Sequence, residues 1–204
     1  MPKLDWFLAK RPLTTDIECG DAGILREFDN KIFITLFDVL GHASKNVHKI
    51  VIIIEEYLEK NYRKELIEII KGLHEHIMGS RGVAIGLGLL DLKTGELKYV
   101  GVGNIIARKF GSSTVRIIPR SGIVGYIMPD PREEIIKLYD GDILVLYTDG
   151  VKESFELEDY PELLKDDAKT IATHLIHQFG KEEDDAACIA LRVRGGGLKN
   201  QKND

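Results

Sequence analysis

Four aspartates at the ends of apolar runs are the residues in this sequence best suited to chemistry. Asp21 lies in C-G-D-A-G, Asp38 in F-D-V-L-G-H, Asp149 in L-Y-T-D-G-V and Asp184 in E-D-D-A-A. Each adjoins a strand-like run, so folding can bring distant carboxylates to one rim. Mg²⁺ and Mn²⁺ prefer oxygen ligands, and two such ions about 3.5–4 Å apart can hold a water and a phosphoryl group for in-line attack. The aspartates therefore predict a two-metal phosphomonoester hydrolase.

Size and charge limit the alternatives. A chain of 204 residues that is 44% hydrophobic is long enough for one domain with a core and short for two. The formal net charge of −5 argues against non-specific binding to nucleic acid or to a membrane surface, because both require a basic face. An anionic substrate then needs local cations, which bound metal ions would supply.

Cysteine usage indicates a reducing compartment. Cys19 and Cys188 are the two cysteines, and no Cys-x-x-Cys pair occurs, so neither a disulfide framework nor a structural zinc site is expected. Cys188 precedes Arg194 by six positions, but the intervening residues contain no glycine and read as a strand, which excludes a phosphate-cradling loop. With no signal peptide and no apolar run of roughly 18–20 residues, we expect a cytoplasmic protein.

The hydrophobic pattern predicts mainly antiparallel strands with helices in the middle and at the end. Two strands, residues 17–28 and 31–39, flank a turn at Asp29-Asn30 and precede the first helix. Residues 44–77 have helical periodicity with a break at residues 61–63, and a last helix, 168–179, follows Asp166-Asp167 and stops at Gly180. Further strands are expected at 83–92, 96–102, 105–110, 114–119, 134–139, 143–147 and 186–193, with Asp140-Gly141 predicting a hairpin. This order indicates an α+β sandwich.

Four segments carry a resemblance to a known family. G-D-A-G, F-D-V-L-G-H-A, D-G-D-I-L-V-L-Y-T-D-G-V-K-E and D-D-A-A resemble the successive motifs of the protein phosphatase 2C (PPM) family in its bacterial SpoIIE/RsbU/RsbX branch, most closely the stand-alone RsbX type. They occur in the family's order and span residues 20–191. The resemblance implies two packed antiparallel β-sheets flanked by helices, in one domain over residues 1–194. Residues 195–204 are expected to form a disordered polar tail.

The resemblance also implies a role for each motif residue. Asp38 would bridge two divalent cations, Mn²⁺ or Mg²⁺, and the backbone carbonyl of Val39 would ligate one of them. Asp21 would face that second ion, and Asp149 with Asp184 would complete the shell of the first. Asp185 is an alternative to Asp184, because only one of two adjacent residues entering a strand can point at the ions.

Several roles stay open from the sequence. His42 would donate a proton to the leaving seryl or threonyl oxygen, or would instead cap the following helix or orient a ligand. Ala43 and Ala187 depart from the family pattern, where glycine and threonine or serine are usual, without removing a proposed ligand. No arginine for gripping phosphate can be assigned, and Arg26 and Arg120 are guesses.

The function implied is a metal-dependent serine/threonine protein phosphatase of a stress-response signalling pathway. Its partner would be a phosphorylated STAS-domain protein, either a stressosome scaffold or an anti-sigma-factor antagonist. The alternatives are a catalytically weak binding module of the same fold, or a hydrolase for a small phosphorylated metabolite, for which no pocket motif is present.

Overall fold

The computed structural model describes residues 3–13, 19–41 and 47–194. Its helices are α1 (Val47–Asn61), α2 (Leu66–His76) and α3 (Ala168–Phe179), with two short 3-10 helices, η1 (Leu157–Asp159) and η2 (Leu163–Lys165). Its strands are β1 (Lys3–Arg11), β2 (Asp21–Phe28), β3 (Lys31–Val39), β4 (Val83–Asp91), β5 (Glu96–Val102), β6 (Ile106–Phe110), β7 (Val115–Ile117), β8 (Glu134–Lys137), β9 (Ile143–Tyr147) and β10 (Ala186–Arg194).

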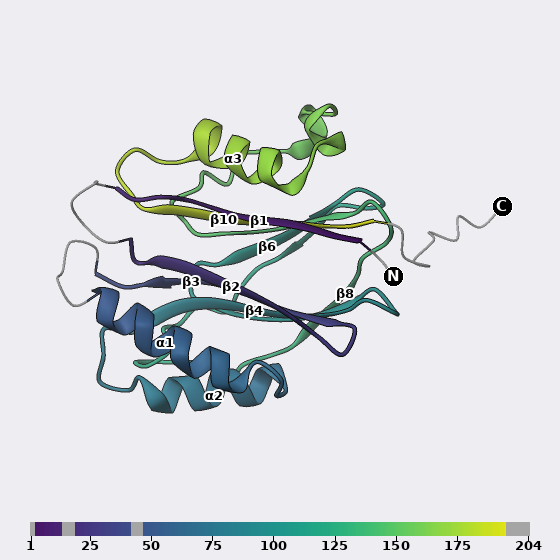
Figure 1. Cartoon of the computed structure of the whole chain (residues 1–204). Coiled ribbons are helices and arrows are strands. Elements are labelled where there is room, and N and C mark those ends of the chain that lie inside the picture. Colours follow the sequence, from purple (N-terminus) through teal and green to yellow (C-terminus); the bar gives the residue numbers. More distant parts are fainter. Residues whose placement is uncertain (1–2, 14–18, 42–46, 195–204) are drawn as a thin grey trace.

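The strands form two five-stranded sheets, packed as a sandwich between helices. One sheet has the order β1-β10-β9-β6-β7 and the other the order β2-β3-β4-β5-β8, and neighbouring strands are antiparallel throughout. Figure 1 shows α3 outside the first sheet and α1 and α2 outside the second. The predicted fold class, two packed antiparallel sheets flanked by helices, is confirmed.

Three apolar clusters lie between the four layers. On β3, Phe33 and Phe37 pack towards α1 and α2, whereas the alternate residues Ile32, Ile34 and Leu36 pack between the two sheets. Successive side chains of a strand point to opposite faces, so a strand covered on both faces becomes a continuous apolar run. A third cluster packs Ile171 and Leu175 of α3 on the outer face of the first sheet.

Local signals placed several elements correctly. Asp29 and Asn30 have φ angles of 47° and 62°, which is the conformation of a two-residue hairpin turn between β2 and β3. The β-branched run at residues 51–54 lies within α1, as the helical periodicity predicted. Asp167 caps α3 by accepting a hydrogen bond of 2.7 Å from the Thr170 N–H.

The prediction that two strands precede the first helix is wrong, because β1 forms a third. Strand β1 pairs with β10 along its whole length, from Lys3 opposite Arg194 to Arg11 opposite Ala186. Leu4 and Leu8 pack between the sheets, and Ala9 faces α3. The alternation of side chains between the two faces of β1 is present in the sequence, but the charged residues among them obscured the strand pattern.

The predicted hairpin at Asp140-Gly141 is also wrong, although the turn itself is present. Gly141 has a φ of 87° and the Asp142 N–H donates to the Tyr139 carbonyl at 3.0 Å. However, β8 pairs with β5 in one sheet, whereas β9 pairs with β10 and β6 in the other. Turn residues fix a change of direction but not the sheet that the next strand joins, so this chain crosses between layers here.

Two predicted segments lie partly or wholly outside the described residues. The predicted disordered tail, residues 195–204, lies outside the described residues, as does the start of the strand expected from residue 17. In the described part of the chain, none of the helices has the length and apolar character needed to cross a bilayer.

Candidate metal centre

Two predicted ligands, Asp21 and Asp38, lie directly opposite each other on β2 and β3. Asp21 is 1% exposed and Asp38 is 3% exposed. Residues directly opposite in an antiparallel pair have Cβ atoms about 4.5–5.5 Å apart, so the pairing brings the two acidic groups together at one end of the sheet. The hairpin register that Asp29 and Asn30 set therefore also sets this juxtaposition.

The Val39 carbonyl lies at the same end of the sheet. The Val39 N–H donates to the Gly20 carbonyl at 3.1 Å, which extends the β2–β3 ladder past Asp21. A Cβ atom on Gly20 would lie 3.0 Å from the Val39 carbonyl oxygen, so a larger residue would crowd that oxygen. A glycine before Asp21 thus permits this close approach of the two backbones.

Asn104 is a site residue that the sequence analysis missed. It lies between β5 and β6, and its side-chain amide donates to an Asp38 carboxylate oxygen at 3.2 Å. Gly103, with a φ of 99°, makes the preceding bend. The sequence signal that could have identified Asn104 is a polar residue that follows a glycine between two apolar strands.

Thr148 is a second missed residue, and it joins the two sheets. Its hydroxyl donates to an Asp21 carboxylate oxygen at 2.9 Å and accepts from the Ala187 N–H at 3.0 Å. Asp21 belongs to one sheet, whereas Thr148 follows β9 of the other. The threonine in T-D-G thus positions Asp21 beside the loop that carries Asp149.

The electrostatics show that four carboxylates share this rim. Burial and the negative charge of Asp38 hold the pKa of Asp21 well above its ordinary value, although the Thr148 hydrogen bond lowers it. The charges of Asp185 and Asp149 raise the pKa of Asp21 further. Mutual repulsion of this kind is relieved by a cation.

The loops after β9 and before β10 meet closely at Gly150. A Cβ atom on Gly150 would overlap the backbone carbonyl of Asp185, so only glycine fits there. Asp149, the neighbour of Gly150, is exposed at the rim. Gly150 therefore holds the Asp149 loop against the segment that carries the adjacent acidic pair.

The two members of that acidic pair have different surroundings. Asp185 is buried, and its carboxylate accepts hydrogen bonds from the backbone N–H groups of Leu13 at 2.6 Å and Gly20 at 3.1 Å. Asp184 is half-buried at the start of the same segment. Asp185 thus anchors the chain just after β1, at Leu13, and just before β2, at Gly20.

The donor types fit hard divalent cations, since the rim offers carboxylate and carbonyl oxygens. Among residues 3–13, 19–41 and 47–194, however, no three His, Cys, Asp or Glu side chains converge closely enough to hold an ion in their present conformations. Asp21 and Asp38 instead accept from Thr148 and Asn104. His42, the predicted proton donor, lies outside the described residues.

The side chains of both arginines considered from the sequence are engaged with other groups. The Arg26 guanidinium is paired with Glu59 of α1, and Arg120 donates to the Asp130 carbonyl at 2.8 Å. The guanidinium of a third arginine, Arg81, lies against Gly41, two residues beyond Val39, because a Cβ atom on Gly41 would overlap it. Gly41 has a φ of 98°, so glycine is favoured there for two reasons.

The cysteines are not placed for thiol chemistry. Cys188 is fully buried in the cluster beneath α3, and burial raises the pKa of its thiol. Burial, together with the charges of Asp21 and Asp185, raises the pKa of the Cys19 thiol to about 12. Both thiols are therefore held in the neutral form, which is a poor nucleophile.

Solved structures place this fold among the PP2C-type phosphatase domains. A chain described as "The bacterial stressosome: a modular system that has been adapted to control secondary messenger signaling" has a TM-score of 0.85 at 23% identity, covering 93% of this chain and 100% of that one. RsbX in complex with magnesium has a TM-score of 0.81 at 16% identity, with coverages of 95% and 100%. The PP2C domain of SpoIIE from Bacillus subtilis has a TM-score of 0.74 at 16% identity, with coverages of 96% and 63%.

A sequence profile defines the family. The profile described as Stage II sporulation protein E (SpoIIE) matches residues 29–194, which is most of the chain. A search of curated proteins found no significant match. The chain belongs to the SpoIIE family. Its fold is similar to that of RsbX and of the SpoIIE PP2C phosphatase domain.

Proposed function

We propose that this protein hydrolyses phosphoserine and phosphothreonine on a bacterial signalling protein, using two Mn²⁺ or Mg²⁺ ions at the rim that carries Asp21 and Asp38. The observation that carries the proposal is the direct pairing of these two buried aspartates, with Asp149 and Asp185 close enough to raise the pKa of Asp21. Buried carboxylates that repel one another lower stability, so their presence favours a function that requires them.

In this proposal the carboxylates of Asp21, Asp38, Asp149 and Asp184 and the Val39 carbonyl would hold the two ions. Asp185 has a positioning role, because its carboxylate accepts two backbone N–H groups, one just after β1 and one just before β2. When bound, the ions would lower the pKa of a water molecule and neutralise charge on the phosphoryl oxygens. Asn104 and Thr148 orient Asp38 and Asp21 through the hydrogen bonds described above.

Arg81 supplies the cation that grips the substrate phosphoryl group. Its guanidinium lies against Gly41 at the end of the chain segment that carries Asp38 and Val39. None of the ion pairs among the described residues involves Arg81, so its charge is available to an anion. A planar guanidinium can donate two parallel hydrogen bonds to phosphate oxygens.

The proposed substrate is a phosphorylated STAS-domain protein, either a stressosome scaffold or an anti-sigma-factor antagonist. The similarity to RsbX and to the stressosome-associated chain supports this partner. The predicted role of His42, protonation of the leaving seryl or threonyl oxygen, remains part of the proposal.

The deciding experiment incubates the protein with phosphorylated STAS proteins, with Mn²⁺ or with a chelator, and follows the phosphosites by mass spectrometry. We expect loss of phosphate only with the metal. The Arg81→Ala variant should raise KM for the phosphoprotein at least about tenfold, whereas Arg132→Ala serves as the control. Binding of the STAS protein without hydrolysis of it or of an aryl phosphate would instead support the binding-module alternative.

A further inference from the structure

An open groove runs along one side of the sandwich, and none of the proposed metal ligands lines it. It is lined by β1 around Trp6 and Leu8, by β2 from Gly23 to Arg26, and by α1 from Ile52 to Lys60, and it has a volume of about 1140 Å³. Both β1 and β2 are edge strands, and they lie on the same side of the molecule (Figure 1). We call this feature the β1–β2 groove.

The outer backbone edge of β2 faces this groove. The Gly20 carbonyl accepts from Val39 of β3, so even-numbered residues of this segment direct their backbone groups towards β3. Odd-numbered residues therefore direct theirs outwards, because the direction alternates along a strand. Two side-chain hydrogen bonds agree with this direction. The Leu25 carbonyl accepts from Arg26 Nη1 at 2.7 Å, and the Asp21 carbonyl accepts from Lys10 Nζ at 3.2 Å.

Gly23 lies between these two residues, so its N–H and C=O also point outwards. In the described part of the chain, no strand pairs with the outer side of β1 or of β2. An exposed edge of this kind is a template for a further strand. A Cβ atom on Gly23 would lie 2.9 Å from the Thr35 carbonyl oxygen and 3.0 Å from Ile189, so the side-chain position of Gly23 faces the interior and its outer backbone groups face the groove.

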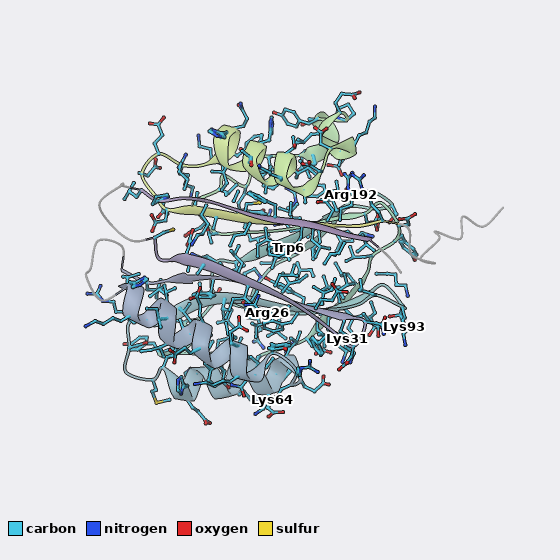
Figure 2. The ribbon with its side chains drawn as sticks, in the orientation of Figure 1. Trp6, Arg26, Lys31, Lys64, Lys93 and Arg192 are labelled. Carbon is cyan, nitrogen blue, oxygen red and sulfur yellow. The ribbon has the colours of Figure 1, made fainter. Side chains whose placement is uncertain are left out.

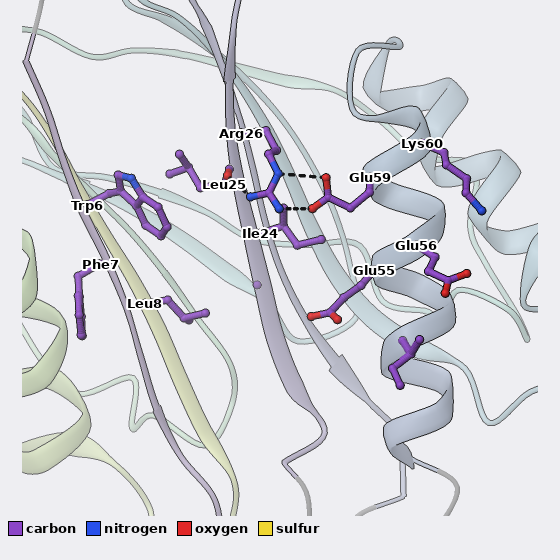
Figure 3. Close-up of a pocket in the computed structure, with 12 residues that line it drawn as sticks. Trp6, Phe7, Leu8, Ile24, Leu25, Arg26, Glu55, Glu56, Glu59 and Lys60 are labelled. Carbon is purple, nitrogen blue, oxygen red and sulfur yellow. Dashed lines mark hydrogen bonds and ion pairs between the residues drawn. The ribbon is translucent and has the colours of Figure 1, made fainter.

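The walls of the groove are apolar near Gly23. Trp6, the only tryptophan of the sequence, is 42% exposed, and Ile52 of α1 is 40% exposed. Figure 2 places Trp6 at the level between the two sheets, and Figure 3 shows it across the groove from α1. Aromatic side chains of this kind are the usual anchors of a docked segment.

The α1 wall carries more acidic than basic side chains, because three glutamates and one lysine, Lys60, line the groove. Glu55 and Glu56 line the groove and make no ion pair with the described residues, whereas Glu59 is held by Arg26 through the bonds drawn in Figure 3. Two carboxylates that have no ion-pair partner in the described ranges, beside apolar side chains, favour a partner that carries both basic and apolar groups. They disfavour an acidic peptide, a nucleic acid or an anionic membrane.

We propose that the β1–β2 groove binds an extended segment of a partner polypeptide in which basic and apolar side chains alternate. The segment hydrogen-bonds to the outer edge of β2 at Gly23, places an apolar side chain against Trp6 and Ile52, and places a basic side chain at Glu55 and Glu56. This mode combines backbone affinity with side-chain selectivity. The proposal does not depend on hydrolysis at the metal centre.

A direct test uses a short peptide of alternating lysine and valine, with the emission of Trp6 as the reporter. Binding should shift the emission to shorter wavelength, because the half-exposed indole becomes buried. The same peptide with glutamate in place of lysine, and a version N-methylated at alternate residues so that it cannot pair as a strand, should both fail to bind. Equal binding of either would overturn the proposal.

Matched variants locate the binding. Ile52→Ala should weaken binding at least about tenfold, whereas Ile53→Ala should leave it unchanged, because Ile53 is 43% exposed on the same helix but does not line the groove. Glu55→Gln with Glu56→Gln should weaken binding about fivefold at low salt and reduce its salt dependence, whereas Glu75→Gln on α2 should not. Thermal melting of each variant would show that it is folded.

Two results would sink the proposal. One is equal affinity in the Ile52→Ala and Ile53→Ala variants, which would place the peptide elsewhere. The other is a Trp6 emission shift that depends on protein concentration without peptide and is lost with Ile52→Ala. In that case the groove is an interface between two copies of this chain, and sedimentation would show the dimer.

Discussion

The Thr148 hydroxyl donates to the Asp21 carboxylate across the interface between the two sheets, at a distance of 2.9 Å. The same hydroxyl accepts from the Ala187 N–H, so a single side chain connects the segments that carry three of the proposed ligands. Folding of the sandwich and assembly of the acidic rim are therefore coupled at Thr148.

Thr148→Val should destabilise the protein by about 1–3 kcal/mol, because it leaves the buried Asp21 carboxylate and the Ala187 N–H without their partner. The free energy of unfolding, measured by urea denaturation, checks this. Thr35→Val is the matched control. The Thr35 hydroxyl is also fully buried, but it has no hydrogen-bond partner among the described residues, so its removal should be neutral or stabilising. Equal losses in the two variants would contradict the role given to Thr148.

Asp38→Asn should move activity and stability in opposite directions. Hydrolysis of an aryl phosphate with Mn²⁺ should fall by at least about 100-fold, since a charged ligand is lost. The metal-free protein should gain on the order of 1 kcal/mol, because the charge of Asp38 raises the pKa of the buried Asp21. Asp130→Asn, which alters an exposed aspartate paired with Lys71, should change neither quantity. Retained turnover in Asp38→Asn would refute the metal assignment.

Substitutions in the acidic pair should separate metal binding from folding. Asp184→Ala should weaken Mn²⁺ binding, measured by calorimetry, with little effect on unfolding. Asp185→Ala should lower the free energy of unfolding by about 1–3 kcal/mol, because two backbone N–H groups lose a charged acceptor. If Asp184→Ala binds Mn²⁺ normally and Asp185→Ala does not at matched stability, the assignments must be exchanged.

Cys188 should not react with a thiol reagent in the native protein. Its side chain is fully buried, and burial raises the pKa of the thiol, so the reactive thiolate is disfavoured at neutral and mildly alkaline pH. A Cys19→Ser variant isolates this thiol. Colorimetric titration should detect one thiol only after denaturation, whereas rapid labelling of the folded variant would show that the cluster beneath α3 opens readily.

The sequence by itself determined the features that depend on neighbouring residues. The turn at Asp29-Asn30, the cap at Asp167 and the helical periodicity of residues 47–76 follow from φ preferences, local hydrogen bonds and the spacing of apolar side chains. The four acidic motifs identified candidate ligands because hard cations require oxygen donors.

Only the tertiary structure decided which strands become neighbours and which polar groups meet. It placed β8 and β9 in different sheets despite the turn at Asp140-Gly141, and it added β1 at the edge of the first sheet. It also brought Asn104 to Asp38 and Thr148 to Asp21, across 66 and 127 positions of sequence. Such contacts arise from the packing of whole layers, in which many apolar side chains contribute together, so no short segment of the sequence encodes them.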